Sequence, residues 1–190
     1  MPPKIKVTKE DIINAAVEVV RIAGEETVNA RAIAQMLGCS TQPIFSNFAT
    51  MDELRMAVVK RADLLFREYM RRETERGEFP PYKASGMAYI RFAKEEKELF
   101  KLLYMRDRSG EAMSEPAAGS EDVTDQMEDL LKSNTTLEGD EIKLFHLEMW
   151  ACVHGIASMF ATGFLDLEWE LVSRMLTDTY QGLRKQYGPE

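Results

Sequence analysis

The sequence contains few of the residues that usually form catalytic or metal sites. Its 190 residues include two histidines and two cysteines. It has no G-x-S-x-G, H-E-x-x-H or C-x-x-C motif and no phosphate-binding glycine loop. His146 and His154 are eight residues apart, which on a straight helix separates them by roughly 12 Å along the axis, too far for one tetrahedral metal site. We therefore expect no enzyme active site, no cofactor and no metal.

The two cysteines, Cys39 and Cys152, are far apart and lie in apolar stretches. We expect two buried thiols in a reducing cytoplasm rather than a disulfide. The N-terminal residues 1–11 lack the apolar region of a signal peptide. These features predict a cytoplasmic protein.

One apolar stretch, residues 145–165, is nearly long enough to cross a bilayer. It contains Glu148, His146 and His154, and each of these side chains is costly to place in hydrocarbon. We therefore expect a buried helix here and no membrane partner.

The sequence is acidic, but its charge is unevenly distributed. With 45% hydrophobic and 29% charged residues it has the composition of a folded globular protein, and its formal net charge is −8. Residues 1–61 carry eight Lys and Arg against seven Asp and Glu, whereas residues 63–190 carry 16 against 25. The acidity belongs to the second part, so the first part is not excluded from binding nucleic acid.

Two helices are predicted at the start of the chain from their capping residues and apolar spacing. Thr8 is a candidate N-cap with Asp11 three places on, and the apolar pattern that follows ends near Gly24. A second, shorter helix has Asn29 as its N-cap and Gly38 just beyond its end.

A third helix follows directly, and its proline indicates where it begins. Ser40 is the predicted N-cap and Thr41 the first residue, which places Pro43 in the first turn. The first four N–H groups of a helix have no intrahelical partner, so a proline costs no hydrogen bond there. A fourth helix, capped by Thr50, runs to the RGEFPP sequence at residues 76–81.

The rest of the sequence also shows helical spacing. Predicted helices cover residues 82–108 with a break near 94–97, 120–133, 140–164 and 168–187, with a mobile loop over 110–122. No segment alternates with the period of a strand, so we expect an all-α fold. We divide it into a domain of three helices at 1–62 and a helical bundle at 63–190, joined through the helix at about 51–76.

Ala34, Gly38 and Ile44 fit a helix-turn-helix. They supply a small residue where two helices touch, a backbone able to turn, and an apolar anchor on the second helix. Together with the stretches RIAG, ARAIAQMLGCS, TQPIFSNF and MDELRMAV, they make residues 8–61 resemble the N-terminal domain of TetR-family transcriptional regulators. The resemblance implies that the third helix enters the DNA major groove and that the fourth joins this domain to a ligand-binding domain.

The sequence departs from the family pattern at three positions. Phe45 stands where members commonly have a phosphate-binding tyrosine, Asn47 where they commonly have histidine, and Met51 where a lysine is common. Phe45 has no hydroxyl, whereas the amide of Asn47 still donates a hydrogen bond. These departures imply a weaker grip on phosphate.

The candidate DNA-binding residues combine arm lysines with polar groups of the second and third helices. They are Lys4, Lys6, Lys9, Asn29, Arg31, Ser40, Thr41, Gln42, Phe45, Ser46 and Asn47. Gln42 is the candidate base reader, because its amide can form two hydrogen bonds with adenine. We expect Ile44, Phe45 and Phe48 to pack under the third helix rather than to touch thymine methyl groups.

A stripe of small residues predicts that the C-terminal part forms a dimer. Ala151, Gly155, Ser158 and Thr162 are spaced four, three and four apart, which allows a second helix to approach closely. With residues 168–187 this helix can form half of a four-helix interface, as the resemblance implies. A two-fold homodimer presents two reading helices about 34 Å apart, one helical turn of DNA.

A ligand cavity is expected among apolar and aromatic residues of the C-terminal part. The candidates are Met87, Tyr89, Phe92, Leu103, Tyr104, Met127, Trp150 and His154. Methionine adapts to varied ligands, and seven of the twelve methionines follow residue 80. The expected effector is small and largely apolar, with a polar group for His154 or Tyr104.

Trp150 and His154 have two interpretations. The sequence WACVHG resembles the Trp, His-Gly signature of one C-terminal class in the TetR family. The two side chains are either a pocket wall with a polar group, or a hydrogen-bonded core histidine beside a packed tryptophan.

The sequence as a whole favours a ligand-controlled repressor in which ligand and DNA oppose each other by linkage. The alternative is a helical ligand- or partner-binding module whose N-terminal domain has lost specific DNA affinity. Phe45, Met51 and the acidic second part keep that alternative open.

Overall fold

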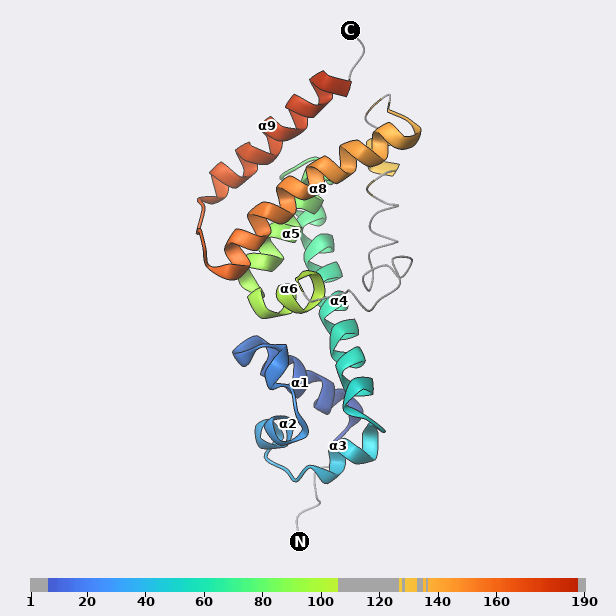
Figure 1. Ribbon diagram of the computed structural model, residues 1–190, viewed down its shortest axis with the longest axis vertical. Helices are drawn as coiled ribbons and strands as arrows, with labels where there is room; N and C mark the ends of the chain where they lie inside the picture. The colour runs from blue at the N-terminus through green and yellow to red at the C-terminus, as the bar shows by residue number, and fades with distance from the viewer. Residues whose placement is uncertain (1–6, 106–126, 128, 133–134, 136, 188–190) are drawn as a thin grey trace. The chain divides into compact units, whose positions relative to one another are not determined.

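The computed structural model describes residues 7–105, 127, 129–132, 135 and 137–187 (Figure 1). Its helices are α1 (Lys9–Ala23), a 3-10 turn η1 (Glu25–Thr27), α2 (Ala30–Leu37), α3 (Gln42–Asn47), α4 (Met51–Arg76), α5 (Pro81–Glu95), α6 (Lys97–Tyr104), α8 (Gly139–Thr162) and α9 (Trp169–Tyr187). No strand occurs among these residues, and the predicted all-α fold is confirmed. The predicted loop at 110–122 lies outside the described residues.

The chain divides into two compact units. We call Met1–Leu65 with Glu98–Asp107 the head unit, and Phe66–Lys97 with Arg108–Glu190 the body unit. The division falls at residue 65, close to the predicted 62, but α6 groups with the head unit rather than with the C-terminal part. Helix α4 contributes residues to both units.

In the head unit, capping side chains fix the starts of α1 and α2, and a glycine fixes the end of α2. Thr8 and Asp11 form a reciprocal capping box, in which the Thr8 Oγ1 accepts from the Asp11 N–H at 3.1 Å and Asp11 accepts from the Thr8 N–H at 2.9 Å. Asn29 Oδ1 accepts from the N–H groups of Arg31 and Ala32, each at 3.0 Å. Gly38 ends α2 at φ 62°, a left-handed conformation that favours glycine. These three predicted helix ends are confirmed.

Helix α3 begins one residue later than predicted. Thr41 precedes it with helical dihedral angles and makes no capping bond through its side chain, so the prediction of Ser40 as N-cap is wrong. Pro43 is the second residue of α3, still within the first turn, and the reason given for its tolerance holds.

Only two of the three apolar residues expected beneath α3 are buried in the core of the head unit. Ile44 and Phe48 are 0% and 2% exposed, but Phe45 is 58% exposed. The prediction that Phe45 packs under the helix is wrong. Successive residues of a helix point about 100° apart, so the turn that directs Ile44 inward directs Phe45 outward.

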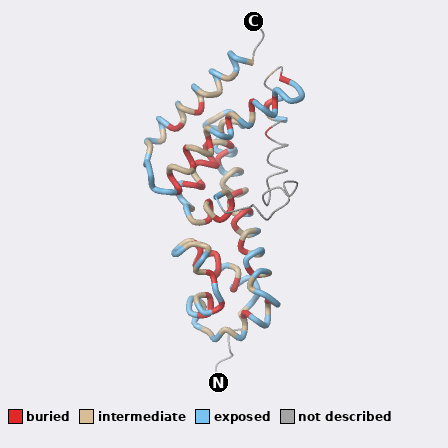
Figure 2. The backbone as a smooth tube through the Cα atoms, viewed as in Figure 1, coloured by how far each residue is buried: buried red, intermediate tan, exposed pale blue. Residues whose placement is uncertain are grey.

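The body unit is built on α5, which packs against α8 and α9. Figure 2 shows buried residues concentrated along α5 and the inner side of α8. Gly86 permits the approach of these helices, because a Cβ there would lie 2.9 Å from Leu176 Cδ2 and 3.3 Å from Val153 Cγ2. The break predicted near 94–97 occurs at Glu96, between α5 and α6.

A buried carboxylate ties α4 to α5 inside the body unit. The Glu73 side chain is 2% exposed. Its carboxylate accepts from Arg91 Nε at 3.0 Å and from Arg76 Nη1 at 3.0 Å. The Arg91 guanidinium also lies over the Trp169 ring, 4.3 Å from its centroid, so one arginine links α4, α5 and α9.

Helix α8 is the described helix that is long and apolar enough to cross a bilayer by length and composition. Its inner face, which includes Ile142, Phe145, Ile156 and Phe160, is buried in the body unit. It is a core helix, as predicted.

The two cysteines are free thiols, but neither is buried. Cys39 and Cys152 are both half-buried, so the prediction of two buried thiols is wrong. Cys39 lies in the turn after Gly38, and Cys152 lies at the side of α8, where its Sγ is 3.5 Å from Thr179 Oγ1 of α9.

Candidate functional site

The predicted helix-turn-helix is present in the head unit. The Cys39 N–H donates to the Ala34 carbonyl at 3.0 Å, which closes the turn after α2. Ala34 is 4% exposed and Ile44 is 0% exposed. The small residue, the left-handed glycine and the apolar anchor therefore occupy the places that the sequence predicted for them.

Two polar side chains of α3 are held by the helix's own backbone. Ser46 Oγ donates to the Gln42 carbonyl at 2.9 Å, and Asn47 Nδ2 donates to the Pro43 carbonyl at 2.8 Å. Gln42 is exposed, and its side-chain amide bonds to none of the described residues. The outer face of α3 therefore presents one uncommitted amide, that of Gln42, beside the Phe45 ring.

The other DNA-binding candidates differ in how far they are already engaged. Lys9 Nζ donates to Glu53 Oε1 at 2.9 Å, which lowers the pKa of that carboxyl group, and it lies 4.6 Å from the centroid of the Phe48 ring. Both amide atoms of Asn29 are bonded, since its Nδ2 also donates to the Thr27 carbonyl at 2.9 Å. Arg31 is exposed on α2. Lys4 and Lys6 lie outside the described residues, and Ser40 and Thr41 lie in the turn before α3.

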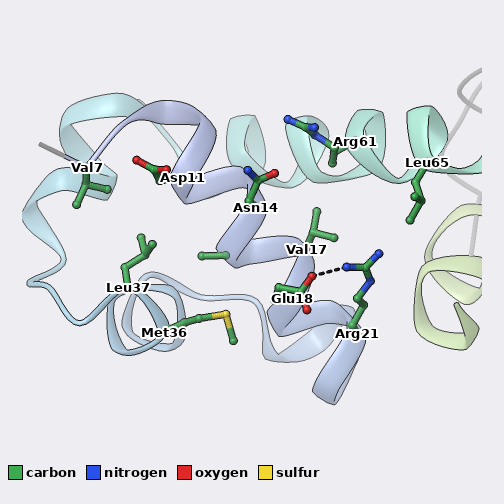
Figure 3. Close-up of a pocket in the computed structure, with 11 residues that line it drawn as sticks. Val7, Asp11, Asn14, Val17, Glu18, Arg21, Met36, Leu37, Arg61 and Leu65 are labelled. Atoms are coloured by element: carbon green, nitrogen blue, oxygen red, sulfur yellow. Dashed lines mark hydrogen bonds and ion pairs between the residues drawn. The ribbon is translucent and has the colours of Figure 1, made fainter. Parts of the chain in front are cut away.

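A groove of about 580 Å³ in the head unit was not predicted from the sequence (Figure 3). It is lined by Val7, Asp11, Asn14, Ala15, Val17, Glu18, Arg21, Met36, Leu37, Arg61 and Leu65. Its arginines are engaged locally, because Arg21 pairs with Glu18 and Arg61 pairs with Glu10. The groove includes no residue of α3, so it is separate from the candidate DNA-reading face.

In the body unit, three of the ligand candidates form one connected group. The Tyr89 hydroxyl lies 2.9 Å from His154 Nδ1, and the Trp150 ring stacks on the His154 ring at a centroid distance of 4.7 Å and an angle of 16°. Tyr89 is 7% exposed and Trp150 is 41% exposed. Burial lowers the pKa of His154.

This group matches neither sequence interpretation completely. His154 is hydrogen-bonded, as expected for a core histidine, but Trp150 is too exposed to be a packed core tryptophan. The three side chains form a chain of direct contacts from the interior at Tyr89 to the surface at Trp150.

Four of the remaining five ligand candidates are buried, and Tyr104 is half-buried. Met87 and Phe92 are 0% exposed, Leu103 is 5% exposed and Met127 is 7% exposed. Leu103 and Tyr104 lie on α6 in the head unit, whereas the other candidates belong to the body unit. A single ligand cavity lined by all eight candidate residues therefore remains a prediction.

A lysine that the sequence analysis did not single out links α5 to α9. Lys83 Nζ donates to Ser173 Oγ and to Thr177 Oγ1, each at 2.8 Å, and lies 4.7 Å from the Phe79 ring centroid. Burial lowers the pKa of Lys83. The two hydroxyls are four residues apart, so they share a face of α9. The sequence shows the spacing of Ser173 and Thr177, but no neighbouring residue indicates that Lys83 is their partner.

The predicted dimer stripe lies on an open face of α8. Ala151 and Thr162 are exposed, and an added Cβ at Gly155 would have none of the described atoms within 4 Å. Large apolar side chains on and just beyond α8 and α9 are also exposed: Leu144, Leu147, Trp150, Phe164, Leu165 and Leu171. Contiguous exposed apolar patches are typical of protein interfaces.

The helical fold and the helix-turn-helix define a DNA-binding regulator of transcription. The family model for the tetracyclin repressor-like C-terminal domain matches residues 82–179, just over half of the chain. The chain therefore belongs to the TetR family of transcriptional regulators, whose members are not enzymes.

Solved structures support the same fold at low sequence identity. A TetR-like transcriptional regulator from Rhodococcus sp. RHA1 is 20% identical with a TM-score of 0.68, and the alignment covers 100% of both chains. SmeT, the repressor of the Stenotrophomonas maltophilia multidrug efflux pump SmeDEF, is 18% identical with a TM-score of 0.59, covering 96% of this chain and 91% of SmeT.

The multidrug-binding protein EbrR, solved with imidazole, is 18% identical with a TM-score of 0.57, covering 90% of this chain and 88% of EbrR. At these identities the likeness concerns the fold alone. No curated protein sequence matches the chain.

Proposed function

We propose that the protein is a cytoplasmic repressor that binds a palindromic operator as a homodimer and is released by a small, largely apolar ligand. The observation that carries this proposal is the outer face of α3, where an uncommitted Gln42 amide and the Phe45 ring stand exposed on the second helix of a helix-turn-helix. Most of this face is left free by the head unit's own packing.

A homodimer is supported by the open stripe at Ala151, Gly155, Ser158 and Thr162 and by the exposed apolar residues around it. A dimer with two-fold symmetry presents two α3 helices to DNA, and its operator has matching symmetry. The operator therefore consists of two inverted half-sites, with centres about 34 Å apart.

A response to ligand is supported by the family and by the construction of α4. SmeT and EbrR, which share the fold, are named for the repression of an efflux pump and for multidrug binding. Helix α4 is continuous from Met51 to Arg76 and belongs to both units. A ligand that favours one conformation of the body unit then alters DNA affinity, and DNA alters ligand affinity by the same factor.

The first experiment selects binding sites from a random DNA pool with the full chain at about 150 mM salt, where non-specific phosphate attraction is weak. The proposal expects an inverted repeat with half-sites one helical turn apart. A folded protein that enriches no sequence favours the alternative, a ligand- or partner-binding module with an inactive head. Phe45 without a hydroxyl and Met51 in place of a lysine are the observations behind that alternative.

A second experiment tests the effector. A thermal-shift screen of small apolar compounds is expected to yield ligands that raise the melting temperature and release the selected operator. A matched Tyr89→Phe variant should respond less to ligands with a polar group, because it loses the hydroxyl bonded to His154. Ligands that stabilise the protein without changing operator affinity would count against release by ligand.

A further inference from the structure

Phe45 contributes little to the core of the head unit. Ile44 and Phe48 already fill the space beneath α3, at 0% and 2% exposed, and Phe45 is 58% exposed. Water contact with a phenyl ring is unfavourable in proportion to its exposed apolar area. A ring kept in this position on a reading helix is therefore expected to gain its packing from what α3 binds.

The side chains around Phe45 limit what that contact can be. Helix α3 carries no charged residue, and the Ser46 hydroxyl and Asn47 amide donate to its own backbone carbonyls. The phenyl ring neither donates nor accepts a hydrogen bond, so it gains little from a phosphate oxygen or from the polar edge of a base. In the major groove, the apolar group available to such a ring is the 5-methyl group of thymine.

We infer that Phe45 reads the 5-methyl group of one thymine in each operator half-site. The inference rests on the proposed function, since it requires α3 to enter the major groove. Gln42 is three residues before Phe45, which places the two side chains about 60° apart around the helix. The apolar reader and the amide reader therefore share one face of α3 and contact neighbouring base pairs.

Replacing thymine by deoxyuridine in the selected operator tests this contact, because it removes the methyl group and keeps base pairing and the O4 acceptor. One thymine per half-site is expected to be sensitive. Its replacement should weaken binding about fourfold, and on the order of fifteenfold when both half-sites are changed, as for the loss of one buried carbon per half-site.

Variants of α3 then assign the effect to Phe45. Phe45→Ala should bind the thymine and deoxyuridine operators equally, whereas Phe45→Tyr, which keeps the ring, should still distinguish them. Gln42→Ala should weaken binding but preserve sensitivity to the methyl group. Thermal unfolding of Phe45→Ala is expected to match the parent protein, because the ring is exposed.

The outcomes separate this inference from the proposed function. If no operator is selected, both fail. If an operator is found but no thymine is sensitive, or if sensitivity persists in Phe45→Ala, the proposed function stands and the role of Phe45 is overturned. Uniform weakening of all operators by Phe45→Ala, without sensitivity to the methyl group, would place the ring against the sugar-phosphate backbone and also overturn it.

Discussion

The Tyr89 hydroxyl on α5 is hydrogen-bonded to Nδ1 of His154 on α8 over 2.9 Å. The imidazole is held between this hydroxyl and the Trp150 ring. Burial disfavours its charged form and lowers the pKa of His154 below its ordinary 6.5. The folded state thus binds fewer protons at His154 than the unfolded state does in mildly acidic solution.

Stability is therefore expected to depend on pH through His154. The contribution of the neutral imidazole is complete above pH 6.5 and is lost as the pH falls through the lowered pKa of the folded state. Urea unfolding at one protein concentration, at about pH 7.5 and pH 5, should show a steeper loss for the parent protein than for His154→Gln.

The matched control is Tyr89→Phe, which removes the hydrogen bond but keeps the histidine. It should lower the free energy of unfolding by about 1 kcal/mol at neutral pH. Equal pH dependence in the parent protein and in His154→Gln would show that His154 titrates alike in both states.

Glu73 is expected to be one of the most sensitive positions of the body unit. Its carboxylate is 2% exposed and bonded to Arg91 and Arg76. Glu73→Ala leaves the partly exposed Arg91 with its longer pair to Glu95, at 3.8 Å, and should lower the free energy of unfolding by about 2–3 kcal/mol. Arg76→Ala is the control, because the Arg76 side chain is 47% exposed and its loss should cost below about 1 kcal/mol. Similar losses in both variants would contradict this account.

Several features that the sequence predicted correctly are formed by neighbouring residues. The Thr8–Asp11 capping box, the Asn29 cap and the left-handed Gly38 each depend on groups within three or four positions along the chain. Such contacts are recognisable from residue type and spacing alone. They locate α1 and α2 and the turn before α3.

The features that it did not predict depend on how distant helices pack. Tyr89 and His154 are 65 residues apart, and Lys83 lies 90 residues before Ser173. The exposure of Phe45 depends on which side of the short α3 meets the core, and periodicity over six residues does not determine that side. The predicted DNA-binding and ligand-binding residues remain predictions, because the DNA and the ligand that they would contact are not part of the chain.

Asn29 offers a test that separates a structural role from DNA binding. Asn29→Ala removes the acceptor for the N–H groups of Arg31 and Ala32 and should lower the free energy of unfolding by about 1 kcal/mol. Asn29→Ser keeps a capping oxygen and should restore most of that loss. If Asn29→Ser is as stable as the parent protein yet binds the operator poorly, the amide contacts DNA as well as capping α2.

Two glycines of the body unit give opposite predictions for the homodimer. At Gly86 an added Cβ would lie 2.9 Å from Leu176 Cδ2 within the same chain. Gly86→Ala therefore forces the buried Leu176 side chain to shift, and this overpacking outweighs the gain in helix propensity, for a net loss of about 1 kcal/mol. At Gly155 the same addition meets no atom of the described residues within 4 Å, so the chain itself tolerates a larger side chain there.

Gly155→Leu is therefore expected to leave the helical content unchanged while it separates the subunits. The leucine would enter the stripe formed by Ala151, Ser158 and Thr162, where the partner's helix is proposed to approach closely. Sedimentation should show half the parent mass, and operator affinity should fall because a single α3 contacts one half-site. A dimeric Gly155→Leu with parental operator affinity would exclude this stripe from the interface and leave the exposed Leu144 and Leu147 end of α8 as the next surface to test.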